Sequence, residues 1–130
     1  MLTLDQAQKM AAKALEKAKD LGIEITVCVV DDDGTLLTSQ RMENAFPISP
    51  EFAMAKAYTS AVLKMPSGDV GKYATPGQPY YGITSAFGGK LMVIAGGLPI
   101  VENGITIGAI GVGGSPDPGQ DLICAQAALK

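Results

Sequence analysis

The sequence of 130 residues contains no histidine. This absence excludes Ser-His-Asp and Cys-His catalytic groups, zinc sites built on histidine, and the commonest axial ligand of haem iron. Any chemistry in this chain must therefore use carboxylates, lysine, arginine, tyrosine, thiols or backbone amides.

Cysteines, basic clusters and long apolar runs are also scarce. The two cysteines, Cys28 and Cys124, form neither a CxxC motif nor a disulfide framework. With a net charge of −3 and no basic cluster, the chain has no electrostatic basis for binding nucleic acid. No apolar run reaches the ~18–20 residues that a membrane span needs, and the first residues read as a helix rather than as a signal peptide. We expect a cytoplasmic protein that binds neither nucleic acid nor membrane.

Length and composition indicate one globular domain over residues 1–130. The chain is 47% hydrophobic and 18% charged, which is enough for a substantial core. No repeat, linker or low-complexity tract divides it. The domain is nevertheless small enough that assembly into oligomers could matter.

Glycines concentrate near the C-terminal end, where residues 96–121 read GGLPIVENGITIGAIGVGGSPDPGQD. Two β-branched runs, Leu98–Val101 and Ile105–Val112, are joined by Glu102-Asn103-Gly104, which predicts a hairpin because Asn-Gly tolerates the positive φ of tight turns. Glycines this dense indicate close approach of the backbone to another chain segment or to a ligand. A nucleotide is disfavoured, since the run lacks both the βαβ context of a dinucleotide fingerprint and a P-loop.

The N-terminal half begins with a helix and a hairpin. Thr3 and Gln6 form a capping box, and apolar residues at helical spacing continue to Leu21-Gly22. Residues 23–30 are apolar at nearly every position, which predicts a central strand covered on both faces. The turn Asp31-Asp32-Asp33-Gly34 leads into a partner strand ending at Arg41. The three aspartates match a solvated turn better than an EF-hand calcium site, which needs alternating acids and a distant glutamate.

The second helix is apolar around almost its whole circumference. We expect Ser49 to cap it and the helix to run from about Glu51 to Met65, with Lys56, Ser60 and Lys64 at four-residue steps. Such a helix must be buried on more than one side, which favours a homo-oligomer. Lys56 is then either part of a solvent-facing stripe or a cation at the edge of a pocket, where it would pair with Asp31, a loop carboxylate or a ligand anion.

A loop-rich stretch follows from Ser67 to Gly89, and it carries Tyr80 and Tyr81. Loops of this length in compact domains are commonly functional or cover another part of the fold, so the two tyrosines either line a ligand or fix the loop. Residues 91–95 read as a further strand, which brings the predicted total to five. Asp117-Pro118 starts a final helix.

Three segments in order resemble the GlcG/HbpS family, also called the haem-degrading domain family, which includes the C-terminal domain of PduO-type corrinoid adenosyltransferases. These segments are VVDDDGTLLTSQRMENA (29–45), AMAKAYTSA (53–61) and GGLPIVENGITIGAIGVGG (96–114). The resemblance spans the whole chain and implies a profilin-like α+β domain, with a five-stranded antiparallel sheet flanked by helices, assembled into dimers or larger homo-oligomers. The positions matching the family pattern are Asp31, Gly34, Arg41, Met42, Lys56, Gly96, Gly97 and Pro99.

For function, the resemblance implies a small-molecule-binding protein whose ligand is an anionic organic molecule or a tetrapyrrole, with haem or a corrinoid as possible cofactors. Without histidine, iron would need tyrosine, methionine or cysteine as its ligand. The predicted ligand site combines Asp31, Arg41, Lys56, Tyr80, Tyr81, Gly96 and Gly97. Two alternatives stay open: an enzyme that uses Lys56 or a tyrosine on a small carboxylate, and a profilin-like interaction platform. Each predicted residue also has an ordinary structural interpretation, namely an ion pair for Arg41, packing for the tyrosines and close backbone approach for the glycines.

Overall fold

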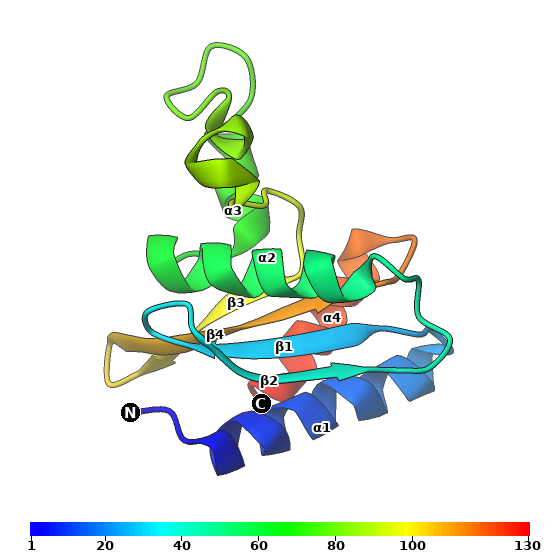
Figure 1. Ribbon diagram of the computed structural model, residues 1–130. Coiled ribbons are helices and arrows are strands. Elements are labelled where there is room, and N and C mark those ends of the chain that lie inside the picture. Colours follow the sequence, from blue (N-terminus) through cyan, green and yellow to red (C-terminus); the bar gives the residue numbers. More distant parts are fainter.

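The computed structural model describes residues 1–130 as an antiparallel sheet with helices on both faces (Figure 1). The elements are α1 (Leu4–Leu21), β1 (Thr26–Asp31), β2 (Leu36–Arg41), α2 (Ser49–Leu63), α3 (Ser67–Lys72), the 3-10 turns η1 (Ile83–Ser85) and η2 (Phe87–Gly89), β3 (Gly97–Glu102), β4 (Ile105–Gly113) and α4 (Pro118–Ala128). The strand order is β2-β1-β4-β3. The predicted α+β class, antiparallel sheet and flanking helices are confirmed.

The sheet has four strands, and the prediction of a fifth at residues 91–95 is wrong. This segment is apolar, but its backbone groups pair with helix side chains rather than with a neighbouring strand. The amide of Met92 donates to the Thr59 hydroxyl of α2, and the Ser67 hydroxyl of α3 donates to the carbonyl of Ile94. Hydrophobicity alone could not distinguish a strand from a connection held in this way.

Both predicted hairpins form with the expected turns. Asn103 and Gly104 take φ values of 53° and 77°, and Gly34 takes 79°, as tight turns between antiparallel strands require. Strand β1 lies between β2 and β4, and five of its six residues are buried. The continuous apolar run therefore predicted a central strand correctly.

Helices α1 and α4 cover one face of the sheet. The capping box of Thr3 and Gln6 starts α1, and Gly22 in the left-handed region ends it. Four alanines of α1 are fully buried, and they join a core with β1, β4 and α4 (Ala7, Ala11, Ala14, Ala18, Val27, Val29, Ile110, Val112, Cys124). Small side chains on α1 let the helix lie close to the sheet.

Helix α2 covers the opposite face, and it approaches strands β3 and β4 very closely. A Cβ atom at Gly111 would overlap the backbone of Ala53 and Ala57, and one at Gly113 would lie 2.7 Å from the Cβ of Phe52. One at Gly97 would overlap the backbone of Lys56. The glycine-rich strand is therefore explained by contact with another chain segment, which is one of the two alternatives that the sequence left open.

The start of α2 differs from the prediction. Ile48, not Ser49, is the N-cap residue, and it makes no side-chain capping bond. Ser49 is fully buried, and its hydroxyl lies 2.7 Å from the hydroxyl of Thr26 on β1. A serine that looks like a cap is used instead to join α2 to the central strand.

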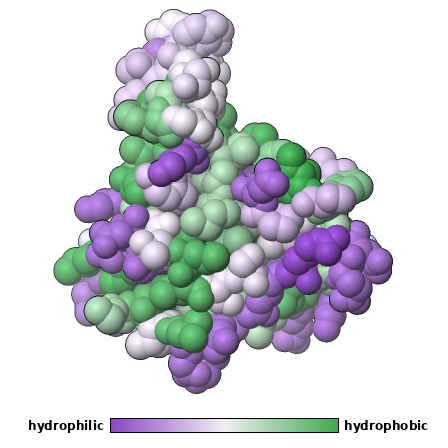
Figure 2. Space-filling view, in the orientation of Figure 1, coloured by the Kyte–Doolittle hydropathy of each residue, from purple (hydrophilic) through white to green (hydrophobic).

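Beyond α2 and α3, the chain from about residue 73 to residue 90 projects away from the sheet as an arm, and it includes η1 and η2 (Figures 1 and 2). Tyr81 and Phe87 on this arm are 67% and 70% exposed. The arm therefore presents aromatic surface outside the two cores. None of the helices is long and apolar enough to cross a membrane.

Candidate functional site

The only charged side chains buried in the protein are Lys56 of α2 and Asp121 of α4, and they form an ion pair. The Lys56 Nζ donates to the Asp121 Oδ2 at 3.0 Å and to the carbonyl of Val112 at 3.0 Å. The other carboxylate oxygen of Asp121 accepts from the amide of Ser115. The pair therefore connects α2, the end of β4 and α4 through bonds to both charges.

Burial alters the protonation equilibria of both partners. Desolvation lowers the pKa of Lys56, and the opposing attraction of Asp121 offsets this only in part. Desolvation likewise raises the pKa of Asp121 against the attraction of Lys56 and the hydrogen bonds it accepts. Both shifts are in the direction of the neutral forms, and the attraction within the ion pair opposes both of them.

A cavity of about 200 Å³ borders this pair. Its lining includes the apolar residues Phe46, Ile48, Phe52 and Ile94 and the polar residues Ser49, Lys56, Ser115 and Asp121. Lys56 and Asp121 are buried, whereas Phe46 and Ile48 are more than half exposed. An apolar space with a few converging polar and titratable groups is the usual composition of a small-molecule site.

Of the two positions that the sequence left open for Lys56, the structure excludes the solvent-facing stripe. The residue is 2% exposed and lines a cavity. Its partner is Asp121, however, and neither Asp31 nor a loop carboxylate. Sequence reasoning missed Asp121 because the two residues lie 65 positions apart. An isolated acid in an otherwise apolar helix was the available signal.

Gly96 and Gly97 are the predicted residues that the structure brings to Lys56. A Cβ at Gly96 would lie 2.9 Å from the Lys56 Nζ, and one at Gly97 would lie 2.8 Å from the Ser60 hydroxyl. The amide of Gly97 donates to the hydroxyl of Ser67. Here the glycines make room for α2 and for the lysine side chain.

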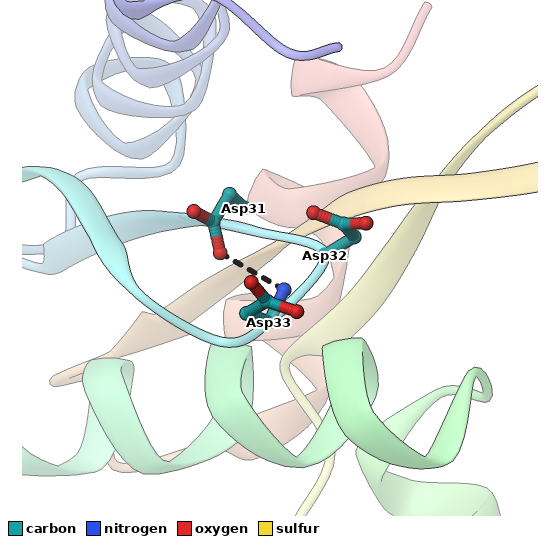
Figure 3. A group of neighbouring side chains, drawn as sticks. All are labelled: Asp31, Asp32 and Asp33. Atoms are coloured by element: carbon teal, nitrogen blue, oxygen red, sulfur yellow. Dashed lines mark hydrogen bonds between the residues drawn. The ribbon is translucent and has the colours of Figure 1, made fainter.

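Asp31 lies at the β1–β2 turn, and Figure 3 shows its carboxylate directed at the backbone of the same turn. One oxygen accepts from the amides of Asp33 and Thr35, at 2.9 Å and 3.0 Å. Asp31, Asp32 and Asp33 each offer an oxygen within 4.8 Å of the others. Asp32 and Asp33 are exposed, and Asp31 closes the turn, as the interpretation of a solvated turn predicts.

The other predicted site residues lie apart from the Lys56 cavity. The guanidinium of Arg41 donates to the carbonyl of Ala45, which fixes the chain that leaves β2. Tyr80 lies on the arm with its ring centroid 6.2 Å from that of Tyr73, and Tyr81 is 67% exposed. The seven residues therefore do not form one pocket.

A second and larger hollow lies between α2 and the β1–β2 hairpin. This α2–hairpin groove has a volume of about 590 Å³ and is lined by Cys28, Gly34, Leu36, Ser39, Pro50, Glu51, Met54, Ala55, Tyr58 and Lys90. Figure 2 shows apolar surface on this side of the molecule, below the arm. The Lys90 Nζ lies 5.7 Å from the centre of the Tyr58 ring. Met54, Tyr58 and Lys90 were missed as site residues because nothing local links an α2 face to a loop residue.

The thiol of Cys124 yields a prediction on alkaline stability. Burial raises its pKa to about 11 from 9.0. Between these values the unfolded thiol ionises while the folded thiol stays protonated. The contribution of this thiol to the free energy of unfolding is therefore fully present below pH 9 and is lost as the pH rises to 11. Denaturation in urea should show Cys124→Ala losing less stability than the wild type over this range, by roughly 2–3 kcal/mol. Equal losses in both proteins would contradict the prediction.

The fold and these two hollows define an α+β protein with an antiparallel four-stranded sheet, helices on both faces and two candidate small-molecule sites. The family model described as "Haem degrading protein HbpS-like" matches residues 2–130, and the chain belongs to this family. The predicted resemblance is confirmed.

Individual relatives agree with this assignment. An uncharacterized 15.0 kDa protein of the dhaT-dhaS intergenic region of Citrobacter freundii is 35% identical, over 98% of this chain and 89% of the relative. The corrinoid adenosyltransferase PduO of Salmonella typhimurium is 33% identical over 98% of this chain but only 38% of its own length. The crystal structure of a PduOC:heme complex superposes with a TM-score of 0.94, at 31% identity, and covers 98% of this chain and 92% of that one.

Proposed function

We propose that this protein binds a haem-type tetrapyrrole in the α2–hairpin groove. The observation that carries the proposal is the groove itself, whose volume of about 590 Å³ falls in the range of small-molecule sites. Its lining combines apolar side chains with one cation, Lys90, and three side chains of types that ligate haem iron, Cys28, Met54 and Tyr58. The structural relative solved with haem supports this ligand class.

The groove supplies the groups that a haem needs although the chain has no histidine. Tyr58 is the proposed iron ligand, since a tyrosine oxygen is an established axial ligand of haem, and Met54 is the other candidate on the same helix. Lys90 provides a cation for a propionate, and Leu36, Pro50 and Ala55 provide apolar surface for the ring. A bound haem would supply iron-centred redox chemistry, and these residues would hold and orient it.

Titration of the purified protein with haemin tests this proposal. Saturable binding of one haemin per chain is expected, with a spectrum unlike that of bis-histidine haem. Tyr58→Phe should change the absorption spectrum, whereas Tyr81→Phe, the matched change on the exposed arm, should leave it unaltered. Lys90→Gln should weaken binding by up to about fivefold, as for an exposed ion pair.

A variant that fills the groove provides the opposing test. Ala55→Trp places an indole where the ring would lie, and it should abolish saturable binding while the far-UV circular dichroism stays native. Unchanged affinity in Ala55→Trp, or the absence of saturable binding in the wild type, would refute the proposal. Unchanged spectra in both Tyr58→Phe and Met54→Leu would remove these residues as ligands.

We further propose that residues 1–130 form one profilin-like domain that self-associates in the cytoplasm. Both helical layers pack on one sheet, which supports a single domain. Apolar residues of α2 and the segment before it stay partly exposed, including Val62 at 37% and Ile48 at 52%, which supports self-association. Two free cysteines are consistent with a reducing compartment.

A further inference from the structure

The cavity beside Lys56 is separate from the α2–hairpin groove, and the two share no lining residue. It is also the place where the protein buries its two charged side chains. Replacing such a pair by apolar residues is often neutral or stabilising in other proteins. A gain in stability therefore does not explain why this protein keeps the pair. The position of this pair at a cavity wall suggests a chemical use.

An anionic ligand does not fit this cavity. Asp121 already balances the charge of Lys56 at 3.0 Å, and the Asp117 side chain caps the start of α4 by accepting from the amide of Gly119. A carboxylate or phosphate entering here would lie beside the Asp121 carboxylate with no free cation to offset it. A small neutral molecule is therefore favoured over the small carboxylate that the sequence suggested.

The geometry also matches one reaction type. An amine and a carboxyl group 3.0 Å apart, both lining a largely apolar cavity, provide a nucleophile for a carbonyl carbon and a proton donor for its oxygen. The Val112 carbonyl holds the amine from a second direction at 3.0 Å. We propose that Lys56 forms a reversible imine with a small aldehyde or ketone bound in this cavity.

The step balances within the pair. With the shared proton on Asp121, the Nζ lone pair attacks the carbonyl carbon, a C–N bond forms, and the carbonyl oxygen takes the Asp121 proton. The nitrogen then returns one proton to the Asp121 carboxylate. This proton passes to the hydroxyl group, which leaves as water while the nitrogen lone pair forms the C=N bond. The product is an iminium ion beside the Asp121 carboxylate, so the net charge of the site is zero before and after the step.

Two further observations support this use of the pair. Desolvation lowers the pKa of Lys56 and raises the pKa of Asp121, which favours the neutral amine and acid that the first step needs. The volume of about 200 Å³ restricts the substrate to a compound of a few carbon atoms. The walls of Phe46, Ile48 and Ile94 favour an aliphatic substituent on the carbonyl.

Trapping with propionaldehyde and cyanoborohydride at pH 7 tests the inference, because the reductant converts an imine into a stable propylated lysine. Peptide mass mapping gives the rate at each lysine. Lys56 is expected to react at least about tenfold faster than the exposed Lys64, which has no adjacent acid and lines no cavity with it. In urea, where all lysines are equally accessible, this preference should vanish.

Two variants show whether the cavity and its acid are responsible. Ile48→Trp narrows the cavity mouth and should slow propylation of Lys56 by about tenfold, whereas Ile105→Trp, at an exposed site on the β3–β4 hairpin, should not. Asp121→Asn removes the proton donor and should also slow it, provided that the circular dichroism spectrum stays native. Propylation of Lys56 that is slower than that of Lys64, or that is insensitive to Ile48→Trp, would overturn the inference. Neither outcome depends on haem binding.

Discussion

Lys56→Met is expected to lower the free energy of unfolding by about 3–5 kcal/mol, because it leaves the Asp121 carboxylate buried without its partner. Urea denaturation at pH 7 measures the loss. The matched control is Lys9→Met, which removes an ion pair of similar length, 3.1 Å, whose side chains are 75% and 76% exposed. Solvent and salt screen that surface pair, so the free energy of unfolding of Lys9→Met should be nearly that of the wild type.

The double variant Lys56→Met/Asp121→Leu separates the cost of an unpaired charge from the value of the pair itself. Both buried charges are then gone, and most of the lost stability should return. A loss in Lys56→Met no larger than that in Lys9→Met would show that Asp121 is not buried against the lysine as the structure has it. A double variant as unstable as the single one would assign the loss to packing of the lysine stem.

Gly111→Ala is expected to destabilise the protein by about 3 kcal/mol or more, and at 37 °C it should yield little folded protein. The new methyl group would overlap the backbone of Ala53 and Ala57, and a helix backbone cannot move aside as a flexible side chain can. Either α2 must shift away from β4 or the sheet must bend, and both disturb the buried layer between them.

Gly119→Ala is the control for this substitution. Its methyl group would lie 3.1 Å from the Asp117 side chain, and Gly119 lies in the first turn of α4. Alanine also has the higher helix propensity, so the melting temperature should change little. If Gly111→Ala melts at the temperature of Gly119→Ala, the close approach of α2 to β4 would not be required for the fold.

Most of the local structure could be predicted because its signals lie between neighbours in the sequence. The capping box of Thr3 and Gln6 depends on residues three apart, and the turn at Asn103-Gly104 depends on the φ that these residues tolerate. The apolar run of β1 predicted a central strand, because consecutive apolar residues indicate a strand that is covered on both faces. Two local predictions were wrong because hydrogen bonds to distant elements decide the structure there. The Met92 amide in the predicted strand donates to Thr59 of α2, and the Ser49 hydroxyl, predicted as a cap, bonds to Thr26 of β1.

The sequence by itself determined the α+β class, the two hairpins, the family and the exclusion of histidine chemistry. Only the tertiary structure decided which residues meet. Asp121 reaches Lys56 because α2 and α4 converge at the end of β4, and Lys90 reaches Tyr58 because the chain returns from the arm past α2. Charge and hydrophobicity specify that a buried lysine needs a partner, but strand order and helix placement select the partner.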